Sequence, residues 1–166
     1  MKQLADIAIS AAFTRTVATA FTMTALALLA SAEGRAPLGP VNASSHWLHG
    51  EDAVNGGQAD LAHTGTGFAT NHLACIFWAL PFEYRLAGQK RLTPAAILRD
   101  ACATAGMAAA VDYGLMPKRL TPGWEDAVTA RSVIGAFGAM ALGLAVGALV
   151  TRSLREPHAT RSADSG

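Results

Sequence analysis

The sequence predicts an all-α fold, an integral membrane bundle of four helices with a long extracytoplasmic loop between the first two. Three observations lead to this prediction. Only 15% of the 166 residues are charged, against about 25% in an average soluble domain. Hydrophobic residues make up 51% of the chain and are gathered into long runs. In the last of these runs small residues recur at every fourth position, as in closely packed membrane helices. We therefore expect residues 1–154 to form a single transmembrane helical domain.

The first apolar run, residues 16–32, allows two interpretations. It is either the main part of a membrane helix over about residues 7–32, or the apolar region of a secretory signal peptide. The sequence Ala30-Ser31-Ala32 matches a signal cleavage pattern. The polar segment before the run is unusually long for a signal peptide, which favours a retained helix.

Residues 33–62 form a polar connection, and a structureless loop of this length would be unusual. We expect a short helix over residues 43–54 on the membrane surface, with Trp47 at headgroup depth. The second span follows at about residues 62–86, since no formal charge occurs between His63 and Glu83.

The third and fourth spans each begin at a pentapeptide, Lys-Arg-Leu-Thr-Pro, that occurs twice, at residues 90–94 and 118–122. In each copy Thr is a suitable N-cap and Pro a suitable first helical residue. These starts predict spans over about residues 94–115 and 122–152. The remaining residues, 155–166, have the composition of a disordered tail.

The last span carries a stripe of small residues, Gly135, Ala139, Gly143 and Gly147. Because such a stripe lets another helix approach closely, we expect it to make the closest helix–helix contact in the molecule or in a dimer.

The distribution of Lys and Arg sets the orientation of the bundle. With four spans, the N-terminus, the loop near residues 86–94 and the C-terminal tail lie on one side of the membrane. That side carries most of the Lys and Arg residues, so the positive-inside rule places both termini in the cytoplasm.

Charged residues within or beside the spans predict interhelical ion pairs. Asp112 and Arg131 should lie at similar depth near the outer face, and Arg15, Glu83 and Arg99 near the inner face. Ion pairing satisfies such residues in a membrane, although a transport pathway would use the same residue types.

The predicted outer side carries a cluster of histidines and carboxylates, which comprises His46, His49, Glu51, Asp52, Asp60 and His63. His46 and His49 would share one helical face, which suits two imidazoles that bind a single divalent metal. With His63 beside them they form a candidate metal site. The alternative is that these histidines are ordinary interfacial polar groups, because the chain has no HExxH or CxxC pattern.

His72 should lie about 13 Å deeper than His63, near the middle of the membrane. An intramembrane histidine is a candidate haem ligand, proton relay or metal ligand, and His72 and His63 are the candidate cofactor-binding residues. They fall on roughly opposite helix faces, which argues against one ligand pair from this helix alone. Alternatively, His72 and Asn71 form hydrogen bonds across helices that hold the bundle together. In either case we expect His72 to be buried with a polar partner.

Several function classes receive no support from the sequence. The net charge of +1 and the lack of a basic patch argue against a nucleic-acid partner. No Ser/His/Asp arrangement, phosphate loop or dinucleotide fingerprint occurs, so no catalytic residue is assigned and an enzyme is not favoured. The two cysteines, Cys75 and Cys102, lie in predicted spans and resemble small buried hydrophobes.

Residues 40–126 combine Asn42-Ala-Ser-Ser-His-Trp47, a His63-Thr-x-x-Gly67 pattern, Phe77-Trp78 after His72, and Val111-Asp112-Tyr113 followed by Lys118-Arg-Leu-Thr-Pro-Gly123. This combination resembles small uncharacterised multispan inner-membrane proteins of bacteria. The resemblance implies location in the bacterial inner (cytoplasmic) membrane.

Three functions stay open at this point. The leading prediction is a non-enzymatic membrane protein that is structural or accessory to a larger membrane complex. The second is a haem- or metal-binding membrane protein, and the third is a small proton-coupled permease. The expected partners are the lipid bilayer and either further copies of the chain or a larger membrane complex.

Overall fold

The computed structural model describes residues 2–50, 53 and 57–163, and the elements in this part of the chain are all helical. Four helices are long: α1 (Lys2–Ala32), α5 (Thr66–Ala87), α6 (Pro94–Gly114) and α8 (Ala130–Ala163). The short elements are α2 (Gly39–Ala43), α3 (His46–His49), η1 (Leu61–Gly65), η2 (Lys118–Leu120) and α7 (Trp124–Ala127). The all-α prediction is confirmed within the described residues.

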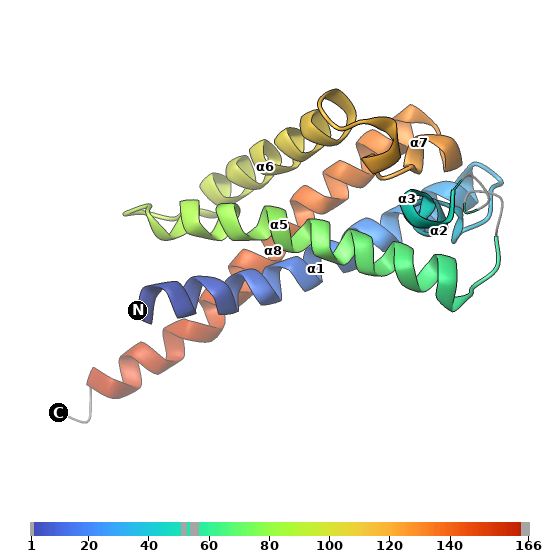
Figure 1. Ribbon diagram of the computed structural model, residues 1–166. Coiled ribbons are helices and arrows are strands. Elements are labelled where there is room, and N and C mark those ends of the chain that lie inside the picture. Colours follow the sequence, from blue (N-terminus) through green and yellow to red (C-terminus); the bar gives the residue numbers. More distant parts are fainter. Residues whose placement is uncertain (1, 51–52, 54–56, 164–166) are drawn as a thin grey trace.

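Helix α1 lies between α8 and α5, and α6 packs mainly on α8 (Figure 1). The chain therefore has two distinct ends. The N-terminus, the α5–α6 connection and the end of α8 meet at one, which we call the inner end. The short elements α2, α3 and α7 gather at the other, the outer end (Figure 1).

The long helices lie near the predicted spans, although α1 begins at Lys2 rather than near residue 7 and α5 at Thr66 rather than near residue 62. The fourth helix differs most. The fourth begins at Ala130 rather than residue 122, because Val128 is extended and α7 is a separate turn that starts after Gly123, whose φ is 73°. The helix also continues to Ala163, through most of the segment expected to be disordered. Extending a helix that is already formed adds one hydrogen bond for each residue fixed.

The expected helix over residues 43–54 is replaced by two shorter ones, α2 and α3. Gly50, with φ at 74°, ends α3 in a conformation that favours glycine. Residues 51–52 and 54–56 lie outside the described part of the chain, and the predicted roles of Glu51 and Asp52 lie there with them.

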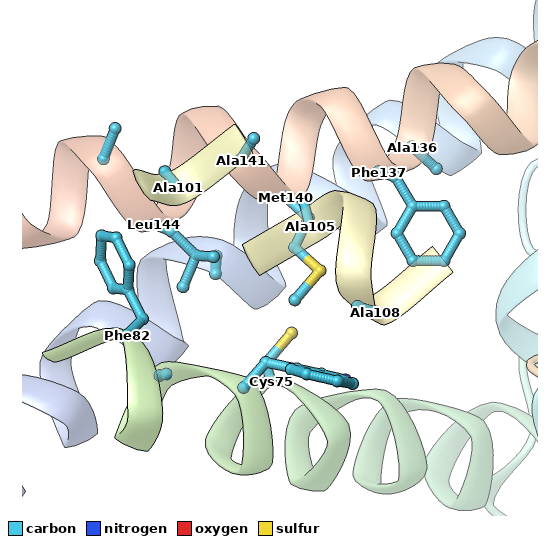
Figure 2. Close-up of a cluster of buried hydrophobic side chains, with 14 of the residues drawn as sticks. Cys75, Phe82, Ala101, Ala105, Ala108, Ala136, Phe137, Met140, Ala141 and Leu144 are labelled. Carbon is cyan, nitrogen blue, oxygen red and sulfur yellow. The ribbon is translucent and has the colours of Figure 1, made fainter. Parts of the chain in front are cut away.

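The core is built from small residues of α6 and α8 and larger ones of α5 and α8. Figure 2 shows Cys75 and Phe82 of α5 facing toward Met140 and Leu144 of α8. Alanines of α6 and α8 lie between the two backbones and are fully or almost fully buried; they comprise Ala101, Ala105, Ala108, Ala136 and Ala141. Small side chains in these positions let α6 lie close to α8.

The glycine stripe of α8 faces α1. A Cβ atom at Gly143 would lie 2.6 Å from the Ala18 Cα, and one at Gly147 would lie 2.7 Å from the Thr14 Cα. These two glycines therefore let the two backbones come together. Gly135 faces the flexible end of Leu29 instead, and Ala139 is half-buried.

An even closer approach occurs at Gly67, at the start of α5. A Cβ atom there would overlap the carbonyl oxygen of Val41 in α2. Among the glycines, the closest approach within the molecule is therefore at Gly67 and not in the α8 stripe. At this position α2, in the connection that follows α1, contacts α5. The sequence shows no stripe of small residues there, because a single glycine is enough for the contact.

Glu33 links the end of α1 to the start of α8. Its carboxylate accepts hydrogen bonds from the Ser132 hydroxyl, the Thr129 hydroxyl and the Thr129 backbone N–H, the last at 3.0 Å. The Ser132 and Thr129 hydroxyls hold the pKa of Glu33 below its ordinary value. An anion here also complements the partial positive charge at the N-terminus of α8.

Two helices are long and apolar enough to cross a membrane, α1 over Leu4–Ala32 and α8 over Ala130–Arg155. By length and composition alone, a buried core helix or an N-terminal signal sequence would also pass this test.

Candidate functional site

His63 and Asp60 form a structured start to the second long helix. The Asp60 carboxylate accepts a hydrogen bond from the His63 backbone N–H at 2.6 Å and lies 3.0 Å from the His63 Nδ1. The backbone hydrogen bond from His63 is the main cause that lowers the pKa of Asp60. Asp60 thus acts as a cap for η1, which leads directly into α5.

His49 reaches this cap from α3. Its ring centroid lies 4.9 Å from that of His63, with the two planes tilted by 54°. The His49 Nε2 is buried and has no hydrogen-bond partner among the residues that the structure describes. The structure therefore brings two of the predicted metal ligands together.

His46, the third predicted ligand, is oriented elsewhere. Its Nδ1 lies 2.8 Å from the Ala43 carbonyl oxygen, and its Nε2 lies 3.1 Å from the Lys118 carbonyl oxygen. Both ring nitrogens face backbone carbonyl oxygens, a neutral ring donates to one of the two, and His46 lies between α3 and η2. Among the described residues no group of three His, Cys, Asp or Glu side chains could hold a metal ion, so the predicted His46–His49–His63 site is not formed there.

His72 is half-buried and has the polar partner that the sequence predicts for it. Its Nδ1 lies 3.1 Å from the Thr19 hydroxyl of α1, and its ring stacks on Phe68. The Thr19 hydroxyl donates to the Arg15 carbonyl oxygen, so it accepts from the Nδ1–H of His72. This hydrogen bond joins α1 to α5, which agrees with the bundle-holding interpretation for His72. The Asn71 amide instead donates to the Gly67 carbonyl oxygen of its own helix.

Glu83 forms a buried ion pair at the inner end. It is 2% exposed, accepts a hydrogen bond from the Thr14 hydroxyl at 2.7 Å and pairs with the Arg152 guanidinium at 3.2 Å. The expected partner, Arg15, instead donates to the Ala12 carbonyl oxygen of its own helix. Sequence reasoning missed Arg152, although it is the first charged residue after the uncharged run of α8.

A polar cavity of about 310 Å³ borders the Glu83–Arg152 pair between α1, α5 and α8. Asp6, Ser10 and Gln89 also line it. The buried ion pair therefore borders a cavity at the inner end whose lining is partly polar.

Asp100 forms a second buried ionic cluster at the same end. It is 1% exposed and lies 3.2 Å from the Arg85 Nε of α5 and 2.9 Å from the Arg99 Nη2. The Gln89 amide also donates to it. Arg99 therefore pairs with its own neighbour, and the interhelical ion pair is the one made by Arg85.

The expected pair at the outer end is not formed. Asp112 is half-buried and Arg131 is exposed, and neither belongs to an ion pair in the part of the chain that the structure describes. Arg131 lies in the first turn of α8 on its outward side, so it does not face α6. Asp112 lines a small cleft between α5, α6 and the outer elements.

An apolar groove of about 560 Å³ runs between α6 and α8. Small residues, Gly106 of α6 and Gly138 of α8, open its centre, since a Cβ atom at either would meet nothing within 4 Å. Ile134 and the exposed Cys102 also line it. The residues that line the groove are almost all apolar.

No protein family, curated protein or solved structure matches this chain.

Proposed function

We propose that the chain is a four-span integral membrane protein of the bacterial inner membrane that serves as a structural or accessory subunit of a larger membrane complex. The observation that carries the first part is the outer surface of the long helices, on which many large apolar side chains are exposed while several polar side chains are buried. A soluble helical bundle turns its apolar faces inward and its polar residues outward.

Buried polar side chains line the contacts of α1 and α5 along their length; they comprise Ser10, Thr14, Thr19, Thr22, Asn71 and Glu83. Large apolar side chains point outward from the same part of the bundle; among them are Leu28, Leu73, Phe77, Met107, Ile134 and Leu142. Contact with lipid is favourable for such an apolar outer surface, whereas contact with water is not.

Helices α5 and α6 are less apolar than α1 and α8. Their packing against these two helices supports the proposal that α5 and α6 also span the membrane. The Arg85–Asp100 pair joins α5 to α6 at the inner end, and the Glu83–Arg152 pair joins α5 to α8 there. Neighbouring helices shield the polar side chains of a less apolar helix from lipid, so that such a helix can still span the membrane.

The packing of α1 supports a retained helix rather than a cleaved signal. Thr14 and Leu26 are fully buried, and Thr14 donates to the buried Glu83. Loss of α1 would leave that carboxylate without one of its partners. The basic residues at the inner end, Arg85, Arg99 and Arg152, support a cytoplasmic inner end.

The groove between α6 and α8 supports the accessory role. Its lining of Ala and Gly residues is the kind that receives a transmembrane helix of another subunit. The partner helix would lie along Gly106 and Gly138, where the surface is most open.

Photo-crosslinking in native membranes tests this role. A benzophenone amino acid in place of Ile134, which lines the groove, should give an adduct of one discrete mass. The same amino acid in place of Leu142, which is exposed outside the groove, should give only lipid adducts. Gly106→Leu should abolish the discrete adduct because it fills the groove, whereas Ala103→Leu on the same helix should not.

An adduct that survives Gly106→Leu, or lipid adducts alone at Ile134, would contradict the accessory role. An adduct of twice the chain mass would show that the groove receives a second copy of this chain and not another subunit.

A further inference from the structure

The cleft that holds Asp112 has a composition that the membrane role does not explain. Its volume is about 190 Å³, and it lies between α5, α6, α3 and the segment after η2. Asp112 is joined there by Thr70, Asn71, Thr121 and Trp47. Within the described chain no hydrogen bond or ion pair joins the Asp112 side chain to another residue.

Most of the donating groups around this cleft already have protein acceptors. The Trp47 indole N–H donates to the Thr70 hydroxyl, which in turn donates to the Thr66 carbonyl oxygen. The Asn71 amide donates to the Gly67 carbonyl oxygen at 2.9 Å.

The Thr121 hydroxyl lies 2.8 Å from the Glu125 carboxylate and 2.9 Å from the Lys118 carbonyl oxygen, so it donates to one of these two acceptors. What the cleft offers a ligand is therefore a set of acceptors: the Asp112 carboxylate, the Asn71 side-chain oxygen and hydroxyl lone pairs. Asn71 is only 6% exposed, so its oxygen is fixed in place.

The negative charge of the carboxylate favours a cation as the ligand. Because each buried acceptor needs a hydrogen-bond donor, that cation should be small and carry N–H groups.

A residue next to the cleft in sequence, Arg119, adds a second charge. The Arg119 guanidinium lies 3.4 Å from the Trp47 carbonyl oxygen, beside Leu120 and Thr121, which line the cleft. A lone cation would be repelled by Arg119, whereas a ligand with an adjoining phosphate would be attracted to it. Trp47 also prefers the depth of lipid headgroups.

We propose that this cleft binds a phosphoethanolamine group, with its primary ammonium on Asp112 and Asn71 and its phosphate on Arg119. The group is carried either by a lipid, as the headgroup of phosphatidylethanolamine, or by a free soluble molecule. The lipid form rests on the membrane location proposed above, and neither form requires the accessory role.

Lipid binding to the purified full chain in detergent micelles tests the proposal, with native mass spectrometry as the readout. Short-chain phosphatidylethanolamine should bind more tightly than phosphatidylcholine of the same chain length, whose quaternary ammonium has no N–H to donate. Asp112→Asn should weaken phosphatidylethanolamine binding about tenfold or more and remove the preference. The matched control is Asp126→Asn, an exposed carboxylate of α7 at the same end, which should bind as the wild type does.

Ala74→Leu fills the cleft without changing its charge and should also remove the preference, so the test does not depend on the folding of the Asp112 variant. Equal binding of the two lipids by the wild type, or an unchanged preference in Asp112→Asn and Ala74→Leu, would overturn the proposal. Competition by free phosphoethanolamine would support a soluble ligand, and its failure beside tight lipid binding would support the lipid. If the lipid-binding test succeeds and the crosslinking test fails, the proposed ligand site stands and the proposed accessory role does not.

Discussion

Replacing Arg152 by Leu should destabilise the folded chain by about 3 kcal/mol, because it leaves a buried carboxylate without its cation. Glu83 is 2% exposed and keeps only the Thr14 hydroxyl as a partner in this variant. An unfolding titration of the purified protein in detergent measures the change in the free energy of unfolding. Arg155→Leu is the matched control, since Arg155 is exposed and donates only to the Asp6 carbonyl oxygen.

The double variant Glu83→Gln/Arg152→Leu separates the loss of the pair from the loss of Arg152 packing. It should recover most of the lost stability, because a neutral amide is much less costly to bury than an unpaired carboxylate. A double variant that is as unstable as Arg152→Leu would show that the ion pair is not the source of the effect.

Replacing Gly143 by Leu should separate α1 from α8 and reduce stability by at least about 3 kcal/mol, since a side chain there cannot fit without movement of a backbone. Its Cβ would lie 2.6 Å from the Ala18 Cα and 3.0 Å from the Phe21 Cβ. The same unfolding measurement applies.

Gly138→Leu, on the same helix, is the control for the effect of helix composition. Nothing lies within 4 Å of a Cβ atom at Gly138, so this variant should keep nearly wild-type stability. Equal losses at the two positions would mean that glycine matters for the helix itself and not for its contact with α1.

The existence and approximate places of the four long helices could be predicted from the sequence, because uncharged runs and caps are local signals. Thr93, for example, accepts the Ala96 N–H as an N-cap at 3.2 Å, as its Thr-Pro pattern indicates. The second copy of that pattern did not start a long helix. There Trp124 packs on Phe137 and donates to Ser44, and these distant contacts hold α7 as a separate turn.

The ion-pair partners could not be predicted because depth alone does not fix them. Arg15 and Arg152 both lie near Glu83 in depth, and only the rotation of α1 and α8 about their axes selects Arg152. The divergence of the histidines has a similar cause. A single tight approach, Val41 onto Gly67, sets the path of α2 and α3, and the carbonyl oxygen of Lys118 then takes up His46.

Labelling of single cysteines in intact membranes tests the membrane bundle most directly. Leu73, Leu142 and Leu120 have similar exposure, 64%, 51% and 57%, and the first two lie midway along α5 and α8 while the third lies at the outer end. Each is replaced by Cys in a Cys102→Ser background, since Cys75 is buried, and treated with a charged, membrane-impermeant maleimide. If lipid surrounds the helices, Leu120→Cys reacts and the two mid-helix cysteines react only after denaturation. Reaction of Leu73→Cys and Leu142→Cys as fast as Leu120→Cys would contradict the membrane bundle.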